Sequence, residues 1–91
     1  MGNKIKKGTR VLVRTNQAGV HFGTMEERNG QEIRLSSARR LWSWNGALSL
    51  SEVASKGVDI ANSKISIPVE EIILPTAIEI ILISEKSNLP A

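Results

Sequence analysis

The sequence predicts a mainly β (α+β) fold: a small antiparallel sheet or partly open barrel with one short helix. Three observations predict this class. Short runs rich in Val, Ile and Thr recur along the chain, as β-strands favour. Gly, Asn and Pro separate these runs at close spacing, which is typical of strands joined by turns. Residues 49–57 alone carry both the start and the stop signals of a helix.

The first two strands are predicted at residues 9–15 and 20–27. In the first, two valines alternate with two arginines and a leucine, so one face is apolar and the strand is half-buried. A turn at 16–19 separates it from the second. Gly19 and Gly23 suit a bulge or a close approach of two backbones.

The middle of the chain predicts a hairpin and then a short helix. Asn29-Gly30 is a tight-turn signal, and residues 31–36 and 38–44 follow as one long bent strand or two short ones. Ser49 with Glu52 has the spacing of a capping box, and Gly57 suits the C-terminal stop. A helix of about two turns does not persist alone, so we expect it to dock on the sheet.

The C-terminal part predicts three more strands, at 64–67, 70–74 and 76–84. The last is apolar on both faces, so we expect it to be central or covered, and to offer a surface for self-association. The expected organisation is a flexible N-terminal segment (1–8), a single domain (9–84) and a C-terminal tail (85–91).

Composition excludes several classes of protein. A hydrophobic content of 41% excludes a disordered chain, and the lack of cysteine excludes a disulfide scaffold, a thiolate zinc site and a cysteine nucleophile. The longest apolar stretch, 72–84, contains a proline and a glutamate and is too short to span a bilayer. We expect a cytosolic protein with no membrane association, no metal and no cofactor.

Charge is distributed unevenly along the chain. The formal net charge is +3, but residues 1–45 carry nine Lys or Arg against three Glu, whereas residues 46–91 carry three Lys against six Asp or Glu. We therefore expect residues 1–45 to supply the surface that would bind an anionic partner. Arginine is the informative residue type there, because its planar fork binds phosphate bidentately and stacks on flat rings.

Residues 38–44 are the least ordinary stretch, because both tryptophans lie there beside Arg39 and Arg40 in a chain that is only 3% aromatic. If the stretch is a strand, alternation places Arg40, Trp42 and Trp44 on one face. A base stacked on an indole gains about 1 to 3 kcal/mol, and a neighbouring arginine binds phosphate. The pattern predicts a nucleotide site. The alternative is that one or both rings belong to the core.

A second group, Arg14, Gly19 and His21, is expected to complete the wall of this site. Glycine frees backbone amides for an anion, and histidine donates hydrogen bonds or stacks. The alternative is an ordinary turn glycine and a structural histidine. Adjacent acid pairs such as Glu26-Glu27 point to opposite faces of a strand and cannot act jointly on one bond. We therefore expect no enzyme activity.

A resemblance covers residues 9–84. The motifs that carry it are VRT (13–15), AGVHFG (18–23), ARRLW (38–42), Trp44, GA (46–47), Gly57, KIS (64–66) and EEIIL (70–74). In these the chain resembles a family of small uncharacterised tailed-phage proteins. Very small, cysteine-free phage proteins with basic aromatic pockets are similar to the sponge proteins of the anti-CBASS and anti-Thoeris groups, which sequester nucleotide second messengers.

The resemblance implies an anti-defence protein in the cytoplasm of a bacterial host, and the small size and the apolar last strand predict a homo-oligomer. It would bind a cyclic oligonucleotide or a cyclic ADP-ribose type of signal without cleaving it. The residues expected to bind the ligand are Arg14, Gly19, His21, Arg39, Arg40, Trp42 and Trp44. Two alternatives stay open: an accessory protein that binds single-stranded nucleic acid, and an inhibitor that binds a host protein.

Overall fold

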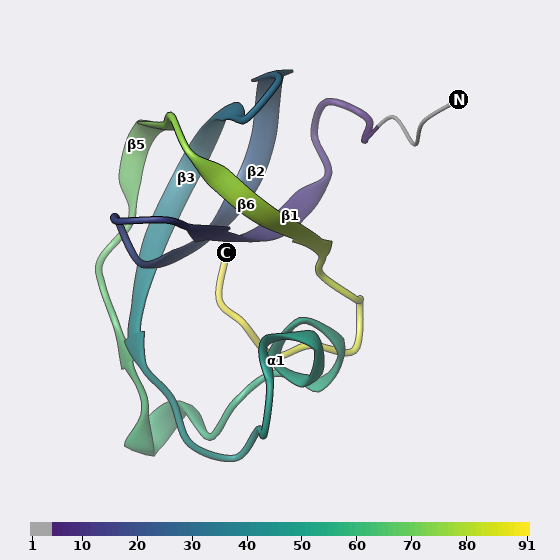
Figure 1. Ribbon diagram of the computed structural model, residues 1–91. Coiled ribbons are helices and arrows are strands. Elements are labelled where there is room, and N and C mark those ends of the chain that lie inside the picture. The colour runs from purple at the N-terminus through teal and green to yellow at the C-terminus, as the bar shows by residue number, and fades with distance from the viewer. Residues whose placement is uncertain (1–4) are drawn as a thin grey trace.

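The computed structural model of the protein describes residues 5–91. Within them, six strands form one open antiparallel sheet in the order β4-β3-β2-β1-β6, with β5 also paired to β3 (Figure 1). Strand accounts for 48% and helix for 11%, which confirms the predicted mainly β class with one short helix. The elements are β1 (Arg10–Thr15), β2 (Val20–Asn29), β3 (Glu32–Ser43), α1 (Leu50–Lys56), a 3-10 turn (Ile60–Asn62), β4 (Lys64–Ile65), β5 (Val69–Leu74) and β6 (Ala77–Leu82).

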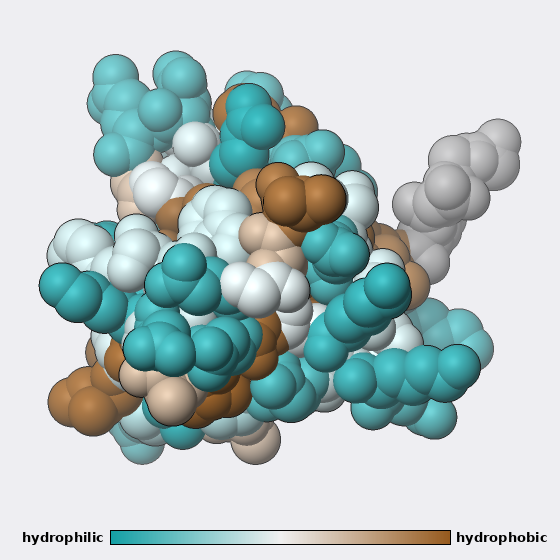
Figure 2. Space-filling model, turned by 90° about the horizontal axis from the view of Figure 1, so that it is seen from below, coloured by the Kyte–Doolittle hydropathy of each residue, from teal (hydrophilic) through white to brown (hydrophobic). Residues whose placement is uncertain are grey.

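The apolar residues form two clusters, one on each side of the sheet, and β1 contributes to both. Val11 and Val13 belong to the first cluster, whereas Leu12 belongs to the second. The second cluster also includes Val53 and Ala54 of α1, so the helix covers this face of the sheet. In Figure 1 the helix lies below the strands. Seen from below in Figure 2, the hydrophobic surface is divided into separate patches on a mostly hydrophilic face.

The helix begins and ends as its sequence predicts. The Ser49 hydroxyl accepts a hydrogen bond from the Glu52 backbone N–H (3.2 Å), and the Glu52 carboxylate accepts one from the Leu48 N–H (2.6 Å). At the other end Gly57 adopts φ +94° and donates its N–H to the Val53 carbonyl (2.8 Å). These caps satisfy groups that a seven-residue helix would otherwise leave unpaired.

The region 31–44 contains one long strand, β3 (Glu32–Ser43), rather than two. Ser37 stands at φ +48° near its middle, and the β2–β3 register shifts on either side of Thr24 and Met25, so the strand bends without breaking. This bend brings two successive partners to one edge of β3. β5 pairs with its first half and β4 with its end.

The last strand was expected to be central or covered; it is not central, but both of its faces are partly covered. β6 lies at the end of the sheet path and pairs only with β1 among the described residues. It is apolar on both faces because each face meets a different cluster: Ile80 packs on the first, and Ile81 on the second. Leu82 is left exposed.

Both expected terminal segments contact the domain where they are described. Of the predicted flexible segment 1–8, residues 1–4 lie outside the described residues, while Ile5 packs on the first cluster and the Gly8 N–H donates to the Met25 carbonyl (2.8 Å). The predicted C-terminal tail places Leu89 in the second cluster. No helix within residues 5–91 is long and apolar enough to cross a membrane.

Candidate functional site

A hollow of about 260 Å³ lies between the middle of β3 and the segment that runs from β4 into β5. Four of the seven residues predicted to bind a ligand line it. Its lining consists of His21, Ala38, Arg39, Arg40, Trp42, Ser66, Ile67, Val69 and Ile72. The wall is mostly apolar, and the charge in it comes from the two arginines.

Arg40 is held from two sides. It pairs with His21 in the β2–β3 register, and its Nε donates a hydrogen bond to His21 Nε2 (3.1 Å). Its guanidinium carbon lies 4.9 Å from the centroid of the Trp42 ring, a cation–π distance. No ion pair within residues 5–91 includes Arg40. The result is a fixed positive charge whose two Nη groups have no hydrogen-bond partner in the described chain.

His21 is a buried, neutral hydrogen-bond acceptor. Burial, and secondly the positive charge of Arg40, lower the pKa of His21 from 6.5 to about 4. Because Nε2 accepts from Arg40, the proton of the neutral ring must be on Nδ1, and Nδ1 has no hydrogen-bond partner among residues 5–91. An unsatisfied buried donor costs about 1 to 3 kcal/mol. The sheet tolerates this cost at the position that orients Arg40.

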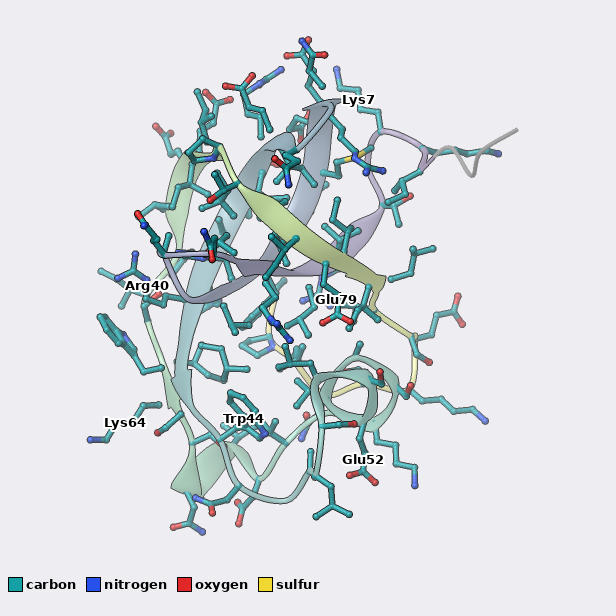
Figure 3. All side chains as sticks on the ribbon, viewed as in Figure 1. Lys7, Arg40, Trp44, Glu52, Lys64 and Glu79 are labelled. Atoms are coloured by element: carbon teal, nitrogen blue, oxygen red, sulfur yellow. The ribbon has the colours of Figure 1, made fainter. Side chains whose placement is uncertain are left out.

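The two tryptophans lie in different places. Trp42 follows the predicted alternation, lies beside Arg40 and is 63% exposed. The prediction that Trp44 shares this face is wrong, because β3 ends at Ser43 and Trp44 packs against the cluster beneath α1. Figure 3 shows Arg40 on the outer side of β3 and Trp44 lower down, toward the helix. Trp44 is half-buried against this cluster, so the alternative that one ring packs on the core rather than in the site applies to Trp44.

Arg39 lies at the rim of the hollow, but its guanidinium donates hydrogen bonds to other residues of the chain. Its Nε donates to the main-chain oxygen of Ala91 (2.9 Å) and its Nη1 to the Ser66 carbonyl (3.1 Å). It lies opposite Phe22 in the β2–β3 register, on the other face of the strand from Arg40. Arg39 therefore supports the wall of the hollow, and Arg40 is the cation with free donors.

Arg14 and Gly19 lie outside the hollow. Arg14 faces β6, where its Nη1 is 3.9 Å from a Glu79 carboxylate oxygen. Gly19 is in the β1–β2 turn at φ +82°, and its carbonyl accepts from the N–H and the hydroxyl of Thr15 (3.0 and 2.8 Å). Both residues were predicted to form part of the ligand wall, but neither lines this hollow. Arg14 forms an ion pair instead, and Gly19 forms part of a turn.

Ser66, Ile67 and Val69 were missed from the sequence. Ser66 joins this segment to β3, because its N–H donates to the Arg40 carbonyl (2.9 Å) and its hydroxyl accepts from the Arg40 N–H (2.7 Å). Ile67 is 80% exposed. Ser66 and Ile67 fall in the strand predicted at 64–67, but no pattern in the sequence placed that strand beside Arg40. Alternation alone does not reveal which distant strand lies beside it.

No group of three or more His, Asp or Glu side chains within residues 5–91 could hold a metal ion. The arrangement offers instead one oriented guanidinium, one exposed indole and an apolar floor. Together these suit a planar ligand that carries a negative charge.

A family model described as a domain of unknown function (DUF6948) matches residues 8–89. No curated protein and no solved structure matches the chain.

Proposed function

The chain belongs to the DUF6948 family, and we propose that it binds a nucleotide and holds it without cleaving it. The phosphate would accept hydrogen bonds from the Nη groups of Arg40, and the base would stack on Trp42. The observation that carries this proposal is the state of Arg40, which His21 and Trp42 fix in place and which no carboxylate among residues 5–91 neutralises.

The way in which Arg40 is held supports an anion as its partner. A guanidinium that is already oriented loses little rotamer freedom when it binds, so less of the binding free energy is lost to ordering. Because Nε is occupied by His21, the two Nη groups form the available edge. Such an edge matches two oxygens of one phosphate.

The size of the hollow limits what one chain can enclose. Ligand pockets for drug-sized molecules measure about 300 to 1,000 Å³, and this hollow measures about 260 Å³. It would take one base with its phosphate, and the rest of a larger ligand would extend beyond it. A cyclic oligonucleotide or a cyclic ADP-ribose type of signal presents such a unit. Given the resemblance to tailed-phage proteins, we propose that sequestration of this signal counters bacterial defence.

The lining favours binding over turnover. None of the residues that line the hollow is a carboxylate. His21 is the remaining candidate base, but its Nε2 accepts from Arg40 and its lowered pKa makes it a weak base. Tight binding with slow release is sufficient for sequestration.

A second candidate is supported by the apolar rim. Trp42, Ile67 and Val69 are all exposed beside the hollow, and exposed apolar groups around an aromatic residue are typical of a protein interface. The protein would then be an inhibitor that binds a host protein. In that case neither the wild-type protein nor the Arg40→Ala variant would bind a nucleotide. Ile67→Ser would weaken capture of the host polypeptide.

The proposal is tested by incubating the purified protein with cyclic di- and trinucleotides, cyclic ADP-ribose isomers and a single-stranded oligonucleotide. Heat denaturation then releases whatever was bound, for identification by mass spectrometry. We expect one cyclic ligand to be recovered intact. Arg40→Ala and Trp42→Ala should each weaken its binding about 10- to 100-fold, as expected for loss of a charged hydrogen bond or a stacked base.

Arg14→Ala is the matched control, because it removes the same charge outside the hollow, and it should leave affinity unchanged. Recovery of a cleaved ligand would contradict the proposed absence of turnover. Retention of the oligonucleotide alone, with affinity that falls steeply with salt, would favour the nucleic-acid alternative. Unchanged affinity in both hollow variants would remove the site.

A further inference from the structure

Within residues 5–91, three strands of the open sheet have an outer edge that pairs with no strand: β4, β5 and β6. On β6 the Ala77 N–H donates to the Gln31 carbonyl (2.8 Å), and the edge beyond Ala77 has no backbone partner in this part of the chain. β6 pairs with β1 along one side, and no strand within residues 5–91 pairs with its other side. We propose that this edge pairs with the same edge of a second copy of the chain, antiparallel, to form a two-fold symmetric dimer. The inference is independent of the nucleotide proposal, because β6 contributes no residue to the hollow.

The direction of the backbone groups follows from the register. The Ile83 N–H donates to the Arg10 carbonyl (3.0 Å), and Ile81 pairs with Leu12 in the same register. In an antiparallel ladder, residues that bond to the partner strand alternate with residues that point away. Ile80 and Leu82 therefore direct their N–H and C=O groups to the free edge.

The free edge of β6 differs from that of β5, its neighbour in sequence. β5 is bounded by Pro68 and Pro75 and carries Glu70 and Glu71, which are residue types that block pairing at sheet edges. β6 contains no proline or lysine, and its single charge, on Glu79, is 3.9 Å from Arg14 of the same chain. In Figure 1 the two strands diverge from a shared turn, and β5 pairs with β3 rather than with β6.

A second copy is the occupant that this edge fits. In a two-fold pair, Ile80 would lie opposite the partner subunit's Leu82, and Leu82 opposite the partner subunit's Ile80. Each opposed pair would exchange two backbone hydrogen bonds. Glu79 would be offset from its symmetry mate by four residues, or about 13 Å along the strand. That separation exceeds the screening length of about 8 Å at physiological salt, so like charges would not oppose pairing.

The apolar side chains beside the edge would also be covered. Ile78, Ile80 and Leu82 line a groove of about 270 Å³ together with Ile5, and the charged residues Arg28 and Glu79 also line it. A pairing centred on so few residues buries less than the roughly 1,200 to 2,000 Å² of a standard interface. We therefore expect a concentration-dependent dimer with a dissociation constant in the micromolar range.

The test is sedimentation velocity over a dilution series from about 1 mM to about 1 µM, which brackets the expected constant. The mass should rise from that of the 9.9 kDa monomer toward twice this value as concentration increases. Hydrogen exchange locates the contact: the amides of Ile80 and Leu82 should become protected at high concentration only, whereas the Ile81 amide, bonded within the chain, should be protected throughout.

Two variants of one exposed residue separate pairing from folding. Leu82→Pro removes a donor at the free edge and leaves the β1 ladder intact, because the Leu82 N–H points away from β1. Leu82→Lys places a charge at the contact. Each should weaken the dimer at least tenfold. The control is Ile73→Lys on β5, where the side chain is exposed to a similar extent (54% against 57% for Leu82), and it should not change association.

A chain that stays monomeric at about 1 mM would overturn the proposal. So would a dimer that Leu82→Lys leaves intact, or one that Ile73→Lys disrupts equally. If Leu82→Pro fails to fold, Leu82→Lys and the exchange pattern decide. Protection of Ile80 and Leu82 that requires another polypeptide would assign the edge to a foreign strand and contradict a dimer.

Discussion

The single histidine is buried and contacts the half-buried, charged side chain of Arg40. His21 is buried in β2, yet it receives the hydrogen bond that orients Arg40 at the hollow. It performs this role only when neutral, because a protonated imidazole has no free acceptor. Its lowered pKa of about 4 keeps it neutral at physiological pH. The same shift connects the site to the stability of the fold.

Protonation of His21 should make stability depend on pH. The ring titrates near 6.5 when unfolded and near 4 when folded, so the unfolded state binds more protons between these values. The contribution is fully present above about pH 6.5 and is lost as pH falls toward 4, by on the order of 3 kcal/mol. Urea unfolding from pH 7 to 4 measures it. His21→Gln, which can still accept from Arg40, should flatten the profile, and parallel profiles for the two proteins would contradict the assignment.

Gly57 is the position where a single methyl group should do most harm. A Cβ there would lie 1.8 Å from Asn88 Oδ1 and 2.6 Å from Asn88 N, and the residue stands at φ +94°. Gly57→Ala should therefore destabilise the fold by about 2 kcal/mol or more. Gly30 is the control, because it also has positive φ (+64°) but open space around its Cβ position. Gly30→Ala should lose about 1 to 2 kcal/mol from the backbone alone, and an equal loss in both variants would show that Asn88 moves aside.

At the scale of the element, the sequence predicted what local chemistry determines. The caps of α1 were readable because Ser49, Glu52 and Gly57 act within one short segment. The Asn29-Gly30 turn was readable for the same reason. The prediction that β1 is half-buried is wrong, because Leu12 packs in the second cluster and both faces of the strand are covered. Gly23 was correctly expected at a close backbone approach, since a Cβ there would lie 2.9 Å from the Ser36 carbonyl oxygen.

The candidate site was predictable only in part. Alternation in β3 placed Arg40 and Trp42 together, and it failed at Trp44 because the strand ends one residue earlier. The opposite wall, at Ser66 and Ile67, depends on β4 and β5 sharing one edge of β3. This arrangement depends on pairing between strands that are far apart in the sequence, and the sequence carries no local signal for that pairing. In the same way, the apolar pattern of β6 did not reveal that this strand lies at the end of the sheet.

At the scale of the whole molecule, the C-terminal segment ties the helix to the sheet. Asn88 donates to and accepts from the backbone of Val58 (2.7 and 2.9 Å), next to α1. The guanidinium of Arg10 in β1 donates to the Leu89 and Pro90 carbonyls (3.2 and 2.7 Å). The segment therefore contacts both layers and closes the second cluster with Leu89. A segment expected to be a tail becomes part of the core.

This role predicts an unequal response to the same substitution at two leucines. Leu89 is 4% exposed and Leu48 is 97% exposed. Leu89→Ala should destabilise the fold by about 2 to 3 kcal/mol, near the lower end for buried leucines because its site is at the edge of a cluster. For a domain of this size each kcal/mol lowers the melting temperature by roughly 4 to 8 °C. Leu48→Ala should change stability by less than about 0.5 kcal/mol. If thermal unfolding shows Leu89→Ala to be as mild as Leu48→Ala, the helix must be docked by the contacts of Val53 and Ala54 alone, and residues 85–91 would be the tail that the sequence predicted.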